Sequence, residues 1–471
     1  MNLDLLFHPK SIAVIGASDN LGGGKMPYFQ ILQMNGFKGA LYPVNPRRGV
    51  VSGVKAYASI DELPEPVDFA IVAAPLEQSI DIIKAAVRKQ IKFIHFFTSG
   101  FGETGNRQLE EDLIREARKG NLRIVGPNCV GIHCSESKIS FTLTPLQESP
   151  GAVAFLGQSG GVTANFLAMA STRKIVLNKV VSYGNQIDLR IEDYLDYLAN
   201  DKNIRLIACY IEDIKNTETF LKTLRRTTAI KPVIILKGGK TETGSKAAAS
   251  HTGAMASNYT IWAAAVRQYG AILVDDFEQM MDLVMLGTIQ KTLTGKRVGF
   301  LGAGGGVSVL FSDLAVKSGL ALPELGAKAQ KMINEKIMGV NTSTTNPIDL
   351  GAFGFDLNIM LHTMKALDED DGIDVIVPYF SVEYIMRSEL FLNVKNNNDT
   401  IFEMAKQIKK PVIPILASFV EDDLDAERIR ISTFAALRKA GFPVYSRMQD
   451  AIYSIGTYFE WAEKRARSKK K

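Results

Sequence analysis

Short apolar runs alternate with amphipathic stretches through the first part of the chain. The runs end in Gly, Pro, Ser or Asn, and they are 11–16, 40–44, 68–75, 92–100 and 122–128. Such runs are typical of parallel strands that are buried on both faces. Helical patterns lie between them, as at 76–90. The pattern therefore predicts βαβ units in a doubly wound α/β domain.

Two later stretches resemble copies of one unit. Residues 153–166 (VAFLGQSGGVTANF) and 298–311 (VGFLGAGGGVSVLF) are identical at eight positions. Each copy later has a predicted strand that begins Lys-Pro-Val. Repeats at this spacing predict two duplicated α/β domains rather than a solenoid. The copies differ in that the first has Ser159 where the second has Gly304.

Composition narrows the class of protein. The chain is 46% hydrophobic and 22% charged, and no run approaches the ~20 apolar residues of a membrane span. The first ten residues lack a signal-peptide pattern, and the three cysteines include no CxxC pair. We therefore expect a cytoplasmic protein with no membrane contact and no metal ligands of its own.

The net charge of +5 is partly due to the basic tail at 464–471, KRARSKKK. We interpret this tail as a solvated end. A nucleic-acid-binding segment is less favoured, because no aromatic residues interleave with the basic ones.

The first predicted strand runs into a glycine-rich turn, SIAVIGASDNLGGGK (11–25). Such a turn before a helix offers backbone N–H groups to a phosphate, although its spacing is not GxGxxG. The second predicted strand is followed by Arg47 and Arg48, where an NAD site usually has an acidic residue. These cations favour a phosphorylated ribose, as in NADP or coenzyme A.

The segment GQSGGV (157–162) allows two functional interpretations. It matches the G-x-S-x-G nucleophile elbow of α/β hydrolases through Gly157, Ser159 and Gly161. It also matches a helix N-terminus that binds a phosphate. The duplicate keeps the glycines and lacks the serine, which favours the phosphate site.

His251 has the least bulky surroundings of the histidines. Its segment, KAAASHTGAMA (246–256), consists mostly of Ala, Ser, Thr and Gly. A histidine that carries a group covalently needs such room, and it needs a partner that fixes its tautomer. We therefore predict a small-residue loop, which would suit His251 as such a carrier. Glu212 and Asp213, which end a predicted strand, are candidate partners.

Eight segments together resemble one family, the NDP-forming acyl-CoA synthetases. In chain order they are SIAVIGAS, YPVNP, VDFAIVAAP, GPNCVGI, FLGQSGGV, CYIED, KPVIILKGG and KAAASHTGAMA. The chain looks most similar to ADP-forming acetate–CoA ligases, which are related to succinyl-CoA synthetase, and the resemblance covers about 8–460.

The resemblance implies an α/β fold with three domains and a tail. An N-terminal Rossmann-like CoA-binding domain would occupy 1–135. Two flavodoxin-like doubly wound α/β domains would occupy 150–290, with the phosphohistidine loop, and 295–465. The basic tail would be 466–471.

The resemblance also implies roles for individual residues. His251 would carry the phosphoryl group and Glu212 would orient it. The phosphate would be held by Ser159, Gly160 and Gly161. The implied CoA positions are Gly16, Ser18, Asn45, Pro46, Arg47, Val72, Ala73, Ala74, Pro75, Ser99, Gly100 and Asn128.

The implied reaction converts acyl-CoA, phosphate and ADP or GDP into an acid, CoA and ATP or GTP, through acyl phosphate and phosphohistidine. No segment resembles the ATP-grasp domain that binds the nucleotide in this family. The resemblance therefore implies an α subunit whose ATP-grasp β subunit supplies the nucleotide and Mg²⁺ sites in an α₂β₂ assembly. The sequence leaves the carboxylic acid undefined.

Three other functions stay open from the residues. A serine hydrolase would use Ser159, His251 and Asp213. A CoA-binding protein without catalysis would have no need of the pair Glu212 and His251. An NADP-linked oxidoreductase would need hydride-site residues, and none is evident.

Overall fold

The computed structural model describes most of the chain. The described residues are 2–20, 22, 26–64, 66–143, 146, 149–252, 258–289, 291, 293–337, 341–386, 404, 406–420 and 422–469, without the side chains of 249–252 and 468–469. The chain divides into two compact units, Met1–Met280 (unit 1) and Met281–Lys471 (unit 2).

The first sheet of unit 1 is parallel throughout. Its strands are β1 (Ser11–Ile15), β2 (Ala40–Val44), β5 (Phe69–Val72), β6 (Phe93–Phe96) and β7 (Arg123–Val125). Their order across the sheet is β2-β1-β5-β6-β7. If only these five strands are numbered along the chain, the order is 2-1-3-4-5. In sheets of this doubly wound order, ligands bind at the carboxyl ends of the strands that correspond to β1 and β5.

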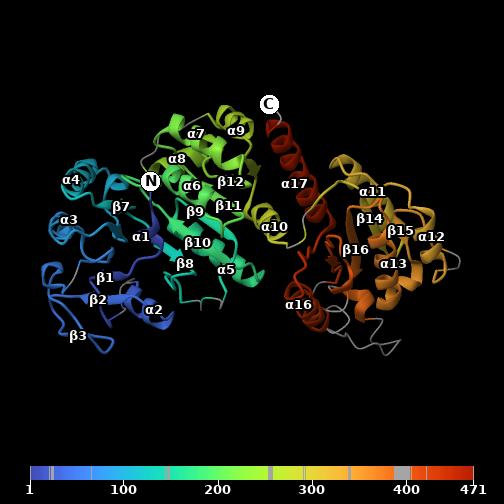
Figure 1. The fold of residues 1–471 in the computed structure, drawn as a ribbon, viewed down its shortest axis with the longest axis horizontal. Coiled ribbons are helices and arrows are strands. Elements are labelled where there is room, and N and C mark those ends of the chain that lie inside the picture. Colours follow the sequence, from blue (N-terminus) through green and yellow to red (C-terminus); the bar gives the residue numbers. More distant parts are fainter. Residues whose placement is uncertain are drawn as a thin grey trace. The chain divides into compact units, whose positions relative to one another are not determined.

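Helices cover both faces of this sheet (Figure 1). The helices are α2 (Tyr28–Met34), α3 (Ser79–Arg88) and α4 (Arg107–Arg118), and a small ribbon joins β3 (Val50–Val51) to β4 (Val54–Lys55). The short helix α1 (Asp4–Phe7) lies elsewhere, and its Phe7 stacks on Tyr197. Apolar residues of α3, Ile82, Ile83 and Ala86, recur at helical spacing and are buried. They join one core with Ala70 and Val72 of the sheet, while Tyr28 packs on the other face.

The second sheet of unit 1 repeats the same topology and adds one strand. Its strands are β8 (Gly131–Cys134), β9 (Val153–Gly157), β10 (Leu177–Ser182), β11 (Leu206–Ile211), β12 (Val233–Lys237) and β13 (Ile272–Val274), in the order β13-β12-β11-β9-β10-β8. All pairs are parallel except β8 with β10. The helices that follow are α5 (Gly160–Thr172), α6 (Ile191–Asn200), α7 (Thr217–Thr228), α8 (Glu242–Thr252), α9 (Tyr259–Gln268) and α10 (Phe277–Gly287).

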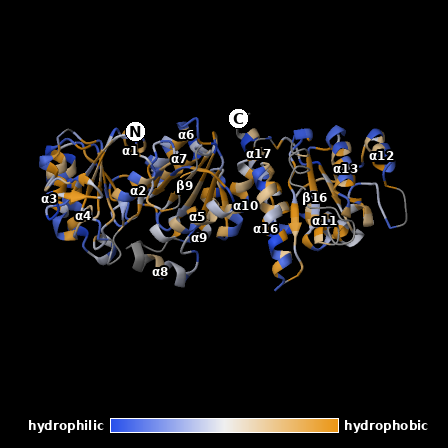
Figure 2. Cartoon of the chain, turned by 90° about the horizontal axis from the view of Figure 1, so that it is seen from below, coloured by the Kyte–Doolittle hydropathy of each residue, from blue (hydrophilic) through white to orange (hydrophobic). Residues whose placement is uncertain are grey.

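Unit 2 contains a third parallel sheet of the same kind. Its strands are β14 (Val298–Gly302), β15 (Ile348–Asp349), β16 (Val375–Ser381) and β17 (Ile415–Ala417), in the order β15-β14-β16-β17. The helices with described bounds are α11 (Gly305–Lys317), α12 (Ala327–Asn334), α13 (Leu357–Glu369), α16 (Leu424–Lys439) and α17 (Met448–Lys469). Figure 2 shows apolar strands such as β9 and β16 inside, and helices with a hydrophilic side around them.

The predicted duplication has a direct structural counterpart. Phe155 stacks on Phe166 with ring centroids 3.9 Å apart, and Phe300 stacks on Phe311 at the same distance. In each copy the ring on the first strand meets the ring on the following helix, so the same aromatic pair fixes the angle between strand and helix.

The structure confirms the α/β fold with its parallel sheets. No helix among the described residues has the length and hydropathy of a membrane span. One prediction is wrong. The residues around His251 do not form a loop up to Thr252, because they belong to α8. Three consecutive alanines have high helix propensity, and Lys246 pairs with Glu242 one turn earlier at 2.7 Å.

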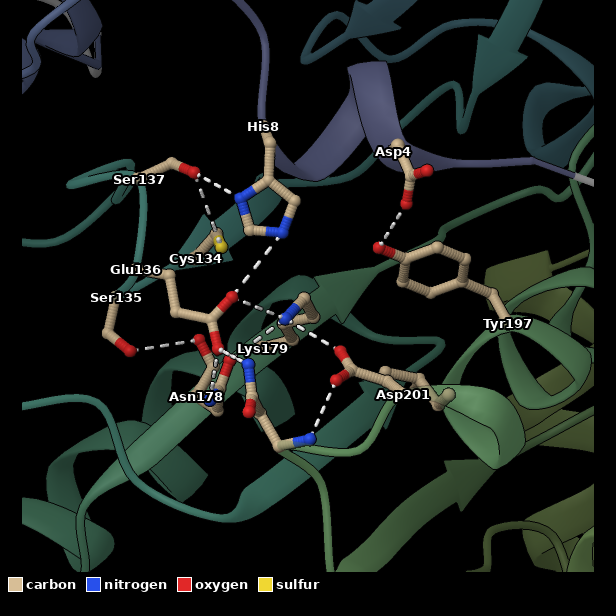
Figure 3. A network of polar contacts seen from close by, with 12 residues as sticks. Asp4, His8, Cys134, Ser135, Glu136, Ser137, Asn178, Lys179, Tyr197 and Asp201 are labelled. Atoms are coloured by element: carbon tan, nitrogen blue, oxygen red, sulfur yellow. Dashed lines mark hydrogen bonds and ion pairs between the residues drawn. The ribbon is translucent and has the colours of Figure 1, made fainter.

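A buried lysine ties the N-terminal segment to the second sheet (Figure 3). The side chain of Lys179 in β10 is 1% exposed, and its ammonium lies 3.0 Å from Glu136 and 2.8 Å from Asp201. Glu136 also pairs with His8, which follows α1, at 3.4 Å. Burial alone would lower the pKa of Lys179, but the hydrogen bond to Asp201 and the nearby acidic groups raise it. The lysine is therefore charged in the folded protein.

We predict that Lys179→Met destabilises the protein by about 3–5 kcal/mol, because it leaves two partly buried carboxylates without their cation. The measurement is the unfolding midpoint in denaturant. The control is Lys222→Met, which removes an exposed ammonium paired with Glu218 within one helix and should leave the midpoint almost unchanged. Equal midpoints for the two variants would show that this network does not contribute to stability.

Candidate functional site

The carboxyl ends of β1 and β5 approach each other closely at the first candidate position. Gly16 follows β1 with φ +85°, and a Cβ there would lie 2.4 Å from the carbonyl oxygen of Ala73. Only glycine fits this conformation and this approach. The predicted CoA positions Val72 to Pro75 therefore border Gly16, and Ser18 follows in the same turn, where its hydroxyl accepts from Asn20 N–H at 3.1 Å.

Asn45 connects the end of β2 to the same turn. Its side-chain amide donates to the carbonyl of Ala17 at 2.7 Å, and its side-chain oxygen accepts from the N–H of Arg47 at 2.9 Å. Pro46 and Arg47 are exposed. The hydrogen bond to Asn45 orders the backbone of Arg47. The side chain of Arg47 is exposed, so its guanidinium is accessible to a ligand. Part of the glycine-rich turn, at 21 and 23–25, lies outside the described residues.

The other predicted CoA positions lie at the ends of β6 and β7. Gly100 has φ +107°, and its N–H donates to Glu103 at 2.6 Å. Ser99 beside it is exposed. Asn128 has φ +57°, and its N–H donates to the carbonyl of Thr98 at 3.1 Å. All the predicted CoA positions thus lie at the carboxyl edge of one parallel sheet, where open α/β folds bind their ligands.

The predicted phosphate site lies at the N-terminus of α5. Ser159 is the N-cap, and its hydroxyl accepts from the N–H of Val162 at 3.5 Å. Gly160 and Gly161 form the first turn, and a Cβ on Gly161 would meet open space. The first N–H groups of a helix have no partner within the helix, so this turn can donate to an anion.

Gln158 links this turn to Glu212. Its side-chain oxygen accepts from the N–H of Glu212 at 2.8 Å and from the N–H of Asp213 at 2.9 Å. Gln158 is 3% exposed, so its amide is fixed. Because β9 and β11 are neighbours, Gln158 holds the end of one strand against the end of the other.

Two further side chains hold Glu212. The ammonium of Lys237, which is 6% exposed, donates to the carbonyl oxygen of Glu212 at 2.8 Å. Burial lowers the pKa of Lys237, against the attraction of Asp213 and Glu212. The Tyr210 phenol hydrogen-bonds the Glu212 carboxylate, and burial together with that charge raises the pKa of Tyr210. Glu212 therefore has a fixed backbone and a directed side chain.

A pocket of about 190 Å³ joins the two sides of the site. Its lining residues come from the ends of β6 and β7, the turn after β10 and the start of α5, and they are Phe97, Asn128, Cys129, Val130, Gln158, Ser159, Gly160, Gly161, Gly184 and Asn185. The predicted phosphate residues and one predicted CoA position, Asn128, thus share a pocket within unit 1.

The backbone of α8 brings His251 toward this region. Gly238 contacts Glu212, since a Cβ on it would lie 3.2 Å from the Glu212 Cγ. Gly239 has φ +72°, and its Cβ would lie 3.3 Å from the Cβ of Ala248. His251 follows Ala248 by one helical turn. Helix α8 also approaches η3 (Gly102–Thr104), next to Ser99 and Gly100. The side chain of His251 lies outside the described residues, as do 253–257.

The geometry does not favour a serine hydrolase. A nucleophile elbow holds its serine on a strained turn. Ser159 instead has an ordinary extended conformation, with φ −93° and ψ 132°, and acts as a helix cap. The carboxylate of Asp213 pairs with Lys215 at 3.0 Å.

The glycine loop of unit 2 is not equivalent to that of unit 1. Gly304 has φ +116°, and its N–H donates to the carboxylate of Asp349 at 2.8 Å. The same oxygen of Asp349 accepts from Gly351 N–H at 2.9 Å. Gly302 ends the first strand of the copy in unit 2, and its partner on the neighbouring strand is Asp349. The equivalent glycine in unit 1 is Gly157, and its partner is Ser182. A carboxylate thus lies beside α11 where α5 has a hydroxyl.

Sequence reasoning missed Gln158, Lys237, Tyr210 and Asn185. Gln158 lies inside the quoted GQSGGV segment, so its position after a strand was a usable signal. Lys237 and Tyr210 lie inside strands, where the apolar pattern suggested only core positions.

Comparisons with known proteins identify two domain families in this chain. Residues 10–135 match the CoA binding domain family, and residues 150–286 match the succinyl-CoA ligase like flavodoxin domain. The α subunit of acetate–CoA ligase [ADP-forming] II from Pyrococcus furiosus is 33% identical over 96% of this chain and 97% of its own. The acetate–CoA ligase [ADP-forming] of Methanocaldococcus jannaschii is 33% identical over 74% of this chain and 49% of its own, so this chain matches about half of it.

A solved structure is similar over nearly the whole chain. It is the dinucleotide forming acetyl-coenzyme A synthetase 1 of Ca. Korarchaeum cryptofilum in complex with phosphate and ADP, with a TM-score of 0.85, 27% identity and coverage of 99% of this chain and 98% of that one. The matched domains define a CoA-binding α/β protein of the succinyl-CoA ligase type. The chain belongs to the family of ADP-forming acetate–CoA ligase α subunits.

We predict that Gln158→Met raises the hydrogen-exchange rates of the Glu212 and Asp213 amides at least about tenfold, because both N–H groups lose their buried acceptor. The measurement is amide exchange followed by mass spectrometry. Gln158→Glu keeps an oxygen in place and should retain the protection. Unchanged exchange in the methionine variant would mean that Gln158 does not hold this strand end.

Proposed function

We propose that the chain is the α subunit of an ADP-forming acyl-CoA synthetase that works through acyl phosphate and a phosphohistidine at His251. The observation that carries the proposal is the hydrogen bond from the Glu212 backbone to the Gln158 side chain. This bond holds the N-terminus of α5, where a phosphate would bind, next to Glu212 at the carboxyl end of β11. Family membership supports the reaction class.

The first step takes place between the strand ends of the first sheet and α5. Phosphate, held by the N–H groups of Gly160 and Gly161 and by the Ser159 hydroxyl, attacks the thioester carbonyl with one oxygen. The C–S bond breaks, the sulfur takes the phosphate proton, and the products are acyl phosphate and CoA. Positioning and the helix N-terminus supply the stabilisation that such a step needs.

The second step transfers the phosphoryl group. A ring nitrogen of His251 attacks phosphorus, the bond to the acyl oxygen breaks, and the acid leaves as a carboxylate. Glu212 accepts a hydrogen bond from the other ring nitrogen and so keeps the attacking nitrogen unprotonated. ADP then takes the phosphoryl group from nitrogen and becomes ATP. Mg²⁺ held by the partner subunit would supply charge neutralisation on the nucleotide.

The nucleotide and Mg²⁺ sites belong to a separate ATP-grasp β subunit in an α₂β₂ assembly, and GDP is the alternative nucleotide. Two relatives whose names contain "subunit alpha" support a divided enzyme. We assign the domains to 1–135, 150–290 and 295–465. The strand β8 at 131–134 lies within the first of these, although it pairs with the second sheet.

We predict that the assembled enzyme takes up label from γ-labelled ATP on this chain, and that the label is acid-labile and base-stable. His251→Asn should abolish the label, because no ring nitrogen remains to accept it. His362→Asn is the matched control, since His362 lies in α13, bonded to the Met332 carbonyl. Glu212→Gln should slow the labelling without abolishing it. An unlabelled wild-type chain, or label that persists in His251→Asn, would contradict the phosphohistidine. Acid-stable, base-labile label would indicate a phosphoserine and would also contradict the proposal.

We predict that Arg47→Gln raises the KM for CoA at least about tenfold and has little effect with dephospho-CoA, because a charge-assisted bond to the 3′-phosphate is worth roughly 1.5–3 kcal/mol. The measurement compares both thiols in the acyl-CoA-forming direction. Arg118→Gln, an exposed change on α4, should alter neither KM. An equal rise in KM for both thiols would show that Arg47 does not recognise the 3′-phosphate.

A further inference from the structure

The turn after β8 brings three potential metal-ligating side chains together (Figure 3). They are His8, Cys134 and Glu136, and their ligand atoms all lie within 4.8 Å of one another. Cys134 ends β8, and its backbone exchanges hydrogen bonds of 2.9 and 3.0 Å with Ile139, so one short hairpin carries both Cys134 and Glu136. His8 reaches this hairpin from the end of α1. A thiol, an imidazole and a carboxylate from two distant segments of the chain thus face one another.

The imidazole of His8 is oriented for coordination through Nε2. Its Nδ1 lies 2.7 Å from the Ser137 hydroxyl, and its Nε2 lies 3.4 Å from Oε2 of Glu136. The second distance exceeds the usual range of about 2.7–3.2 Å for an N–H···O hydrogen bond. It matches the separation of roughly 3.4 Å between nitrogen and oxygen ligands on a tetrahedral Zn²⁺ with bonds of about 2.0–2.2 Å. A metal-binding histidine usually donates its other ring N–H to a polar partner, and Ser137 is placed to be that partner.

The charges around the cluster suit a divalent cation. Lys179 donates to the same Glu136 oxygen at 3.0 Å, and Asp201 lies 2.8 Å from its ammonium. Burial and the charge of Lys179 lower the pKa of His8, so its ring is neutral and has a lone pair to share. An ion that binds Cys134 displaces the thiol proton to solvent. The thiolate, Glu136 and Asp201 then carry three negative charges, which Lys179 and the divalent ion neutralise.

A polar cavity of about 560 Å³ gives an ion access to the cluster. His8 and Glu136 line it, and so do Asp4 and Asp201. Its described lining residues include no Lys or Arg, so its acidic wall attracts cations. The cavity also has room for a water molecule as a fourth ligand, which a Zn²⁺ ion with three protein ligands takes up.

We propose that His8, Cys134 and Glu136 bind a Zn²⁺ ion, with water from the cavity as the fourth ligand. Thiolate and imidazole select a borderline-soft ion over Mg²⁺, which prefers oxygen ligands in an octahedron. The bound ion links the segment after α1 to the hairpin after β8. None of its three ligands lines the pocket at α5, so the site does not depend on the proposed function.

The sequence gave the opposite expectation, that the chain has no metal ligands of its own. That expectation rested on the absence of a CxxC pair. His8 and Cys134 are far apart along the chain, and only the fold brings them together.

The test titrates Co²⁺ into the full chain after a chelator has removed bound metal. Cobalt bound to a thiolate has a charge-transfer band in the near ultraviolet, and a tetrahedral Co²⁺ site has intense visible bands. We expect both sets of bands to saturate at one Co²⁺ per chain. Zn²⁺ should then abolish them by displacing Co²⁺, whereas Mg²⁺ at the same concentration should leave them unchanged.

Variants assign the bands to the cluster. Ser137→Ala should weaken Co²⁺ binding about tenfold and His8→Phe at least about 100-fold, since loss of an outer-shell partner alone typically costs 10–100-fold. Cys134→Ala should abolish the charge-transfer band. Cys209→Ala and His362→Asn are the matched controls, because Cys209 is buried in β11 and His362 lies in α13. Both should bind Co²⁺ as the wild type does.

The outcomes decide the assignment without reference to catalysis. No charge-transfer band in the wild type, or a band that survives in Cys134→Ala, would overturn the site. Equal Co²⁺ affinity in the wild type and His8→Phe would overturn it as well. The His8 side chain is 39% exposed, so this second comparison stays decisive if Cys134→Ala does not fold. Zn²⁺ should also raise the thermal unfolding midpoint of the wild type and not that of His8→Phe, because the ion binds only the folded state.

Discussion

The candidate site depends on the two hydrogen bonds that Gln158 accepts from the backbone of Glu212 and Asp213. They join the ends of β9 and β11, which neighbour each other in the sheet but are distant in the chain. The joining atom is a neutral amide oxygen, so it adds no negative charge beside the helix N-terminus that would bind phosphate. In unit 2 the corresponding loop is held by the carboxylate of Asp349. The same backbone frame therefore offers two electrostatic environments.

The duplicated units show which features the fold requires and which the chemistry requires. The stacked pairs Phe155–Phe166 and Phe300–Phe311 occur in both, because strand and helix must pack at the same angle. Glu212 has no acidic counterpart, since strand register places Ser381 at its position in β16. The polar residues at the strand ends thus differ between the two copies, whereas the aromatic core pair is the same. Such a difference is usual, because a fold provides the scaffold and the site residues provide the function.

The sequence predicted most of the strands because parallel strands buried on both faces leave continuous apolar runs. The prediction for 40–44 coincides with β2. It missed β8, whose four residues pair with β10 far along the chain, so no local pattern reveals them. The sequence analysis predicted a loop for the residues before His251 because their side chains are small. They form part of α8 instead, since alanine has a high helix propensity. The CoA positions stay predictions. The strand ends bring them together at the carboxyl edge of the first sheet.

The arrangement within unit 1 separates fixed groups from the proposed carrier. Phe97, Val130 and Gln158 are held by the sheets and by buried partners, which suits an acyl transfer that demands exact placement of carbonyl and phosphate. Helix α8 is attached differently. It follows the glycines 238 and 239, whose missing side chains let it pack directly on the strand end. The contact that joins it to the strand end is between Gly239 and Ala248, whereas the phosphate turn is held by Gln158. The proposed carrier and the phosphate turn are therefore attached to the second sheet through different residues.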